Sequence, residues 1–313
     1  MDAVGLSGTR LRWRWNKRRR DLGEAGFRTE VLLRGASAKH KMCPSCRALV
    51  PRSASVCTEC GAGLARVRAP GFGRLVSNVL PGATAATSLI LLANGALFLL
   101  MLSATLSSGR GAGLLAAFDG ITMVRFGSGY SPLTVEGREW WRLITPVFLH
   151  GGLLHFAFNS YALLQLGPLV EAEFGTERFA VVYLLSGITG NVASQLLWPG
   201  IRHTVGASGA LCGLIGLLLV YGQRRGGTAG TAVRSGMAQW ALYLLVFSFL
   251  PGIDLLCHLG GFVGGFALGW ILPTGPFRSR GSAIAWEAAA VVTLLLVVAS
   301  FWLVASHPPP ISG

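Results

Sequence analysis

The sequence predicts an all-α fold: a polytopic membrane helical bundle with a small cysteine-bearing segment in front of it. Hydrophobic residues make up 52% of the 313 residues and charged residues only 13%, about half of the roughly 25% that soluble domains carry. Several apolar runs of about 20 residues match a bilayer core of about 30 Å, at a helical rise of about 1.5 Å per residue. Lys and Arg gather at one end, because residues 1–80 hold 16 of the 27 but only five of the 13 acids.

Residues 1–38 form a basic arm. Its run from Arg10 to Arg20, with Trp13 and Trp15 interleaved, has the chemistry to bind nucleic-acid phosphates. A juxtamembrane segment that is attracted to anionic lipid and fixes the topology explains the same charge, and we prefer it to nucleic acid as a partner. The charged stretch is not followed by the apolar core and cleavage site of a signal peptide. We therefore expect a disordered arm and an N-terminus in the cytoplasm.

Two C-x-x-C pairs distinguish residues 39–66. Cys43, Cys46, Cys57 and Cys60 have the spacing of a tetrahedral zinc site, and so short a segment has too little core to fold without a metal or a staple. Two disulfides, or four thiols in a disordered arm, are the alternatives. The spacing predicts a zinc ribbon with one structural zinc ion. Because four cysteine ligands leave no open position for water on the zinc ion, we do not expect the ribbon to catalyse a reaction. We expect it to regulate the protein or to recruit a cytoplasmic partner.

Seven apolar segments follow a linker at residues 67–87. They lie at 88–106, 146–169, 179–198, 205–221, 237–251, 253–272 and 284–305. A cytoplasmic N-terminus leaves most loop arginines inside and only Arg202 in a short outer loop, as the positive-inside rule requires. It also places the C-terminus outside. Residues 88–272 would form the core, and residues 273–313 a linker, a seventh helix and a tail.

Polar side chains at membrane depth are costly and therefore indicate function. They occur near the start of the second, fourth and sixth segments, as His155 and Asn159, Ser208, and His258. These three segments run in the same direction, so the polar groups share one depth. Ser208 opens a helix, where free N–H groups can stabilise an oxyanion, and His258 could accept its proton. His155 and Asn159 are four residues apart and can aim donors at one point.

Each of these signals is weak alone. Gly-x-Ser-Gly in a glycine-rich membrane helix more often serves packing, and a single intramembrane His is as often structural as functional. We expect His150 to be structural, and Cys212 and Cys257 to be small core residues. The joint occurrence of the polar groups at one depth favours a site.

The motifs resemble those of the rhomboid family of intramembrane serine proteases. Gly206-Ala207-Ser208-Gly209 is similar to its serine motif, and Cys257-His258-Leu259-Gly260-Gly261 with Gly265 to its histidine helix. The segment from His150 to Asn159, the pair Trp141-Arg142 and the acid Glu171 are similar to three further family elements. The resemblance covers roughly residues 88–272 and implies a six-helix core, to which this chain adds a seventh helix.

The resemblance also implies a mechanism. Ser208 and His258 would form a catalytic dyad without a cofactor. His155, Asn159 and the backbone N–H of Ser208 would bind the oxyanion. Substrates would be transmembrane segments of other proteins, within the lipid bilayer of what we expect to be a prokaryotic cell. Cys212 stands where many members carry an aromatic residue against the catalytic His, so the resemblance implies that His258 lacks this ring contact.

Three alternatives remain at this point. Asp254, four residues before His258, could be the acid of a triad, although its place after Pro251-Gly252 favours an N-cap. A binding protein that does not cut would be expected to lack a member of the dyad. A transporter with a proton path through His150, His155 and Asp254 would place charges at several depths.

Overall fold

The computed structural model describes residues 40–42, 49–51, 54, 56–59, 61, 84–109, 117–197, 200–201, 203–250, 252–275, 277 and 279–309. The chain divides into two compact units, residues 1–68 and residues 69–313. In the first unit, β1 (His40–Met42) and β2 (Leu49–Pro51) pair antiparallel, with Lys41 opposite Val50. Cys57 is buried there, whereas Cys43, Cys46 and Cys60 lie outside the described residues.

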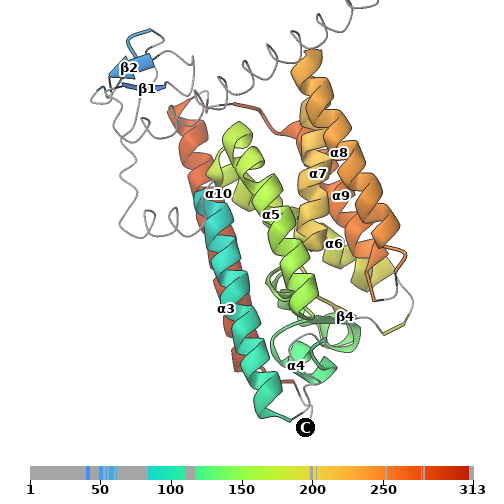
Figure 1. The fold of residues 1–313 in the computed structure, drawn as a ribbon. Helices are drawn as coiled ribbons and strands as arrows, with labels where there is room; N and C mark the ends of the chain where they lie inside the picture. The colour runs from blue at the N-terminus through green and yellow to red at the C-terminus, as the bar shows by residue number, and fades with distance from the viewer. Residues whose placement is uncertain are drawn as a thin grey trace, which may run out of the picture. The chain divides into compact units, whose positions relative to one another are not determined.

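The second unit is a helical bundle (Figure 1). Its helices are α3 (Ala85–Ser107), α4 (Gly120–Arg125), α5 (Leu153–Phe174), α6 (Thr176–Leu197), α7 (Ser208–Arg225), α8 (Gly227–Phe247), α9 (Leu255–Ile271) and α10 (Arg280–Ser306). Among the described helices, α3, α5, α6 and α10 are long and apolar enough to cross a membrane, and α9 is a shorter apolar helix. The chain is therefore a polytopic helical membrane protein, as the sequence predicts.

All seven predicted segments correspond to helices with limits that differ by a few residues, and two of them begin at clearly different residues. The second begins at Leu153 and not at residue 146, because Thr145–Phe148 form a 3-10 turn and Gly152, in extended backbone, is the N-cap of the helix. The fifth begins ten residues earlier, at Gly227, because its first turns consist of small and polar residues that hydropathy does not detect. His150 consequently lies in a loop, outside the membrane-spanning helix.

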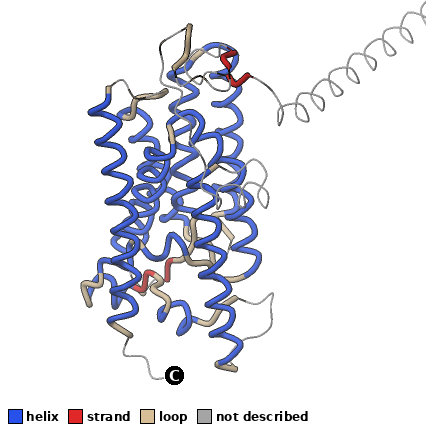
Figure 2. Tube along the Cα trace, turned by 90° about the vertical axis from the view of Figure 1, so that its left-hand side faces the viewer, coloured by secondary structure: helices blue, strands red, loops and turns tan. Residues whose placement is uncertain are grey.

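The connection between α3 and α5 is folded against one end of the bundle. It contains β3 (Gly129–Tyr130), which pairs antiparallel with β4 (His203–Thr204), and three short helical turns, η1 (Pro132–Glu136), η2 (Trp140–Leu143) and η3 (Thr145–Phe148). Figure 2 shows these loops gathered at the end where α5 and α7 begin. Arg142 is fully buried within the connection and donates to the carbonyls of Val124, at 2.8 Å, and Ser128, at 3.2 Å. It thereby holds the loop in one shape.

Helix α7 is the most enclosed helix of the bundle, with α6, α8 and α9 around it. Its contact with α9 runs from backbone to backbone. A Cβ added at Gly261 would lie 2.0 Å from the carbonyl oxygen of Gly209, and one at Gly265 would lie 1.9 Å from that of Gly213. Because small residues permit such an approach, the start of α7 is drawn against the first turns of α9.

Glu171 closes the opposite end of α5. Its carboxylate accepts from the backbone N–H groups of Ala86, at 3.2 Å, and Thr87, at 2.8 Å, and from the hydroxyls of Thr84, Thr87 and Thr176. These donors include the free N–H groups at the start of α3, where a negative charge is favourable. Glu171 thus ties α5 to α3.

Candidate active site

Ser208 and His258 meet where α7 and α9 begin. The Nε2 of His258 lies 2.8 Å from the Oγ of Ser208, which is hydrogen-bonding distance. His258 is 8% exposed and Ser208 is half-buried. Ser208 is the first residue of α7, so its N–H is among those that have no acceptor within the helix. The pair can therefore combine a hydroxyl, a base and a positive helix end.

Gly206 shapes the turn that presents Ser208. Its φ is +125°, which L side chains rarely adopt, and its N–H donates to the carbonyl of Pro146 at 2.9 Å. A Cβ there would lie 2.7 Å from both the Cε1 and the Nε2 of His155. The absent side chain is thus what lets the imidazole of His155 approach the serine loop.

His155 presents a defined edge to this loop. Its Nδ1 accepts from the N–H of Gly151 at 3.3 Å, so in the neutral ring Nε2 carries the proton. That nitrogen faces Gly206, beside Ser208. Asn159 lies one turn further along α5, is 6% exposed, and donates to the carbonyl of His155 at 2.8 Å. An amide has a second N–H to donate, although no hydrogen bond joins Asn159 to Ser208 in the described structure.

His150 packs behind His155. The two rings meet edge to face at 5.4 Å between centroids, and His150 meets Phe156 in the same way at 5.4 Å. Burial, and secondly the proximity of His155, lower the pKa of His150 to about 3, while a backbone interaction with Phe148 opposes the shift. A neutral, enclosed imidazole is suited to support its neighbour and not to relay protons at physiological pH.

Asp254 is the N-cap of α9, and its carboxylate is hydrogen-bonded to groups other than the imidazole of His258. One carboxylate oxygen accepts from the N–H of Cys257 at 3.0 Å, and the other accepts from the hydroxyls of Ser194 and Thr204. The backbone N–H of His258 donates to the carbonyl of Asp254 at 3.1 Å, but within the described residues no hydrogen bond joins the carboxylate of Asp254 to the imidazole. Asp254 is therefore an N-cap in the structure, as the sequence favours.

Ser248 is the neighbour of His258 that the sequence analysis missed. Its Oγ lies 2.5 Å from the Nδ1 of His258. It comes from the turn that ends α8 and is 4% exposed, although the residues beside it are exposed and apolar. Ser248 could have been noticed in the sequence because it is the single polar residue in the apolar run 244–250.

The remaining motif residues have structural surroundings. The ring of Trp141 lies 5.4 Å from that of His307 and so joins the outer loop to the end of α10. Cys212 and Cys257 are both buried, and the thiol of Cys257 lies 3.5 Å from the amide oxygen of Asn191. A Cβ at Gly209 would lie 2.8 Å from the sulfur of Cys257. Cys257 thus packs against the residue that follows Ser208.

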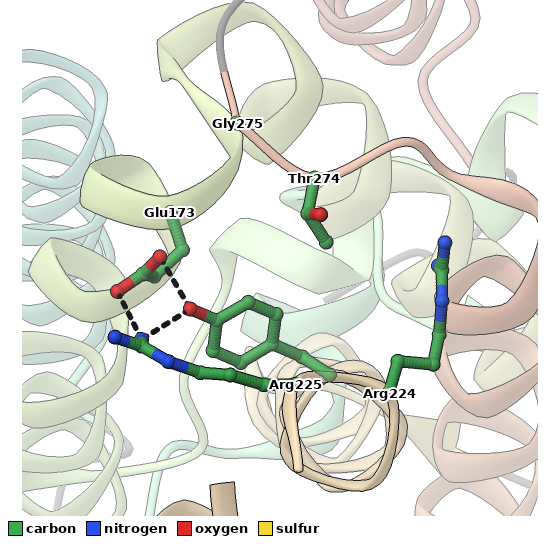
Figure 3. Close-up of a pocket in the computed structure, with 6 residues that line it drawn as sticks. Glu173, Arg224, Arg225, Thr274 and Gly275 are labelled. Atoms are coloured by element: carbon green, nitrogen blue, oxygen red, sulfur yellow. Dashed lines mark hydrogen bonds and ion pairs between the residues drawn. The ribbon is translucent and has the colours of Figure 1, made fainter. Parts of the chain in front are cut away.

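A cavity of about 290 Å³ opens at the end of α7 that is remote from Ser208 (Figure 3). It is lined by Glu173, Tyr221, Arg224, Arg225, Thr274 and Gly275. Arg225 pairs with Glu173 at 3.1 Å, and the hydroxyl of Tyr221 donates to the same carboxylate at 2.5 Å. At a rise of about 1.5 Å per residue, Arg225 lies about 25 Å along α7 from Ser208. The cavity is therefore separate from the Ser208 and His258 pair.

Known proteins resemble the part of the chain that contains Ser208 and His258. Residues 137–274, which contain Ser208 and His258, match the rhomboid domain. The chain is 35% identical over 193 residues to the rhomboid protease GluP of Bacillus subtilis, covering 60% of this chain but only 36% of GluP. It is 37% identical over 145 residues to the putative rhomboid protease YdcA of Bacillus subtilis (46% of this chain, 72% of YdcA), and 33% identical over 184 residues to rhomboid-like protease 1 of Toxoplasma gondii (56% and 61%). On these matches, the chain belongs to the rhomboid family.

Proposed function

We propose that the chain is an intramembrane serine endopeptidase that cuts transmembrane proteins in or near their membrane-spanning segments, with Ser208 as nucleophile and His258 as general base. The observation that carries the proposal is the separation of 2.8 Å between the Oγ of Ser208 and the Nε2 of His258. The names of the relatives, which include rhomboid proteases, support the same reaction.

The reaction proceeds in two halves. The Oγ of Ser208 attacks the carbonyl carbon of the scissile bond while its proton passes to the Nε2 of His258. The tetrahedral intermediate collapses, the C–N bond breaks, and His258 returns the proton to the leaving amine. Water, deprotonated by His258, then attacks the acyl-serine, and the proton goes back to the Oγ of Ser208 as the acid is released.

The developing oxyanion needs donors that are already in position. The Nε2–H of His155 and the backbone N–H of Ser208 are the first candidates, since both lie beside the serine loop. Asn159 would add a third donor by a rotation that turns its second N–H toward the serine. His150 would act indirectly, by holding the ring of His155.

Orientation follows from the charges. Arg178, Arg224 and Arg225 lie at helix ends away from Ser208, and Arg234, about two turns into α8, is hydrogen-bonded to Gln223 near the end of α7. If the positive-inside rule holds, that end faces the cytoplasm of a prokaryotic cell, together with the N-terminus. Ser208, His258 and the C-terminus would then lie near the extracytoplasmic surface. Thiol labelling of Ser7→Cys and of Ser306→Cys in intact cells, each compared with the parent protein, would distinguish this orientation from its inverse.

We propose separately that Cys43, Cys46, Cys57 and Cys60 bind one zinc ion that serves structure or the recruitment of a cytoplasmic partner, and not proteolysis. The support is the spacing of the four cysteines and the chemistry of a closed four-thiolate site.

The protease proposal is tested by incubating the purified full-length protein in detergent with a generic transmembrane substrate. Wild type should cut the substrate, and Ser208→Ala and His258→Ala should not. Ser300→Ala, which removes a buried hydroxyl from α10, is the matched control and should cut normally. A folded wild type that never cuts, or a Ser208→Ala variant that does, would overturn the proposal.

A further inference from the structure

Ser248 is buried, although the residues on either side of it are exposed and apolar. It follows the last residue of α8 and is 4% exposed. Phe247 and Phe249 on either side are 55% and 73% exposed. A hydroxyl enclosed at membrane depth must be hydrogen-bonded to avoid the cost of desolvation. Its partners therefore explain why it turns inward.

Within the described residues, two atoms lie at hydrogen-bonding distance from this hydroxyl. The Oγ of Ser248 lies 2.5 Å from the carbonyl oxygen of Leu244 and 2.5 Å from the Nδ1 of His258. Both separations are so short that each must contain a hydrogen. A serine hydroxyl has one hydrogen to donate, and a carbonyl oxygen has none. The hydrogen of Ser248 therefore points to Leu244, and the second hydrogen comes from Nδ1 of His258.

We infer that Ser248 is a positioning residue that fixes the tautomer and the orientation of His258. With the proton on Nδ1, the Nε2 of His258 has a free lone pair, and this nitrogen lies 2.8 Å from the Oγ of Ser208. That tautomer is the one a general base requires. The hydrogen bonds form one directed chain, from Ser208 to His258, from His258 to Ser248, and from Ser248 to Leu244.

The inference rests on the proposed function and extends it. In a soluble triad a carboxylate holds the second nitrogen of the imidazole, and loss of its charge costs about 10⁴-fold in turnover because the tautomer is wrong. Ser248 makes the same contact with a neutral oxygen, while Asp254 is occupied at the N-cap of α9. A neutral acceptor stabilises the protonated imidazole less than a carboxylate does. We therefore expect a smaller loss, of about 10- to 100-fold, for Ser248→Ala.

The contact also joins two helices that touch little elsewhere. Along α8, Gly230 and Met237 are the buried residues, and α9 packs mainly on α6 and α7. A displacement of the end of α8 would therefore remove the acceptor from Nδ1. The orientation of the base is thus linked to the position of α8.

Steady-state cleavage of a transmembrane substrate tests the role. Ser248→Ala should lower kcat about 10- to 100-fold with KM within about twofold, because the contact acts on the base and not on substrate binding. Ser248→Thr, which keeps the hydroxyl, should restore most of the activity. Ser300→Ala removes an equally buried hydroxyl that makes the same bond to its own helix, at 2.7 Å to Leu296, and should have no effect. A wild-type kcat for a folded Ser248→Ala variant would overturn the inference while leaving the protease proposal intact.

The tautomer of His258 can also be measured by spectroscopy, which does not require the protein to cleave a substrate. Nitrogen NMR of ¹⁵N-histidine-labelled protein, with the signal of His258 assigned by His258→Gln, should show the proton of the neutral ring on Nδ1 in wild type. In Ser248→Ala the two tautomers should become mixed. A proton on Nε2 in wild type would overturn the inference even if the substrate is cut. Absence of cleavage together with the Nδ1 proton would instead overturn the protease proposal and leave the contact between Ser248 and His258 established.

Discussion

Gly261→Ala should separate the nucleophile from the base. The added Cβ would lie 2.0 Å from the carbonyl oxygen of Gly209, 2.7 Å from its carbonyl carbon and 3.0 Å from its Cα. All three atoms belong to the backbone of α7, so no side-chain rotation can relieve the contact. The two helices must move apart where Ser208 faces His258.

The size of the movement follows from these distances. Restoring about 3.0 Å between the Cβ and the oxygen requires a shift of about 1 Å, because nonbonded heavy atoms repel below roughly that separation. Added to the 2.8 Å between Ser208 and His258, the shift gives about 3.8 Å, beyond the range of a hydrogen bond. A misplacement of about 1 Å can cost about 10²-fold in rate, and overpacking costs about 1–3 kcal/mol in stability.

Two measurements check Gly261→Ala. We expect kcat/KM to fall at least about 10²-fold and the thermal midpoint to fall with it, in protein that still purifies as a monodisperse species. Gly236→Ala in α8 is the matched control, because a Cβ there meets no atom within 4 Å, and replacing a helical glycine gains up to about 1 kcal/mol. Activity of Gly261→Ala within tenfold of wild type, at an unchanged midpoint, would refute the backbone contact between α7 and α9.

Three further predictions follow from the site and from the cysteines. Asn159→Ala should lower kcat by no more than about 10²- to 10³-fold, the usual cost of one oxyanion donor; complete loss in folded protein would give Asn159 a larger role. Asp254→Asn keeps the oxygen that caps α9, so activity should stay within about tenfold, equivalent to about 1.4 kcal/mol in the barrier; a loss as large as that of Ser208→Ala would make this a triad enzyme. Elemental analysis should find one zinc ion in the full-length protein and none in the double variant Cys43→Ser with Cys60→Ser. The metal-free variant should still cleave the substrate. Loss of cleavage in that variant would make the zinc ribbon part of the catalytic unit.

The parts of the fold that depend on composition and spacing were predictable. The apolar segments gave the helices, and the shared direction of three of them gave the common depth of His155, Ser208 and His258. The start of α5 was predicted too early because Val147, Phe148 and Leu149 are apolar but buried in a loop. Hydropathy records that a residue avoids water, and it does not distinguish a lipid-facing helix from the interior of a folded loop.

Contacts between segments that are distant along the chain could not be predicted from the sequence. Ser248 stands ten residues before His258, in a different helix end, and only the path of the chain between α8 and α9 brings its oxygen to Nδ1. Likewise, Glu171 could be recognised as a family element, but not as the acceptor for the first turn of α3. The conformation of Gly206 depends on Pro146 and His155, which come from two other segments.

Activation of Ser208 by His258 is tested most directly by its reaction with a fluorophosphonate, whose fluoride the serine oxygen displaces. Peptide mapping by mass spectrometry should locate one adduct on Ser208 of the wild-type protein, and the adduct should be absent from His258→Ala, whose serine has lost its base. Labelling of Ser208 at the wild-type rate in folded His258→Ala would contradict the assignment of His258. An adduct on another serine, with cleavage that survives Ser208→Ala, would contradict the assignment of the nucleophile.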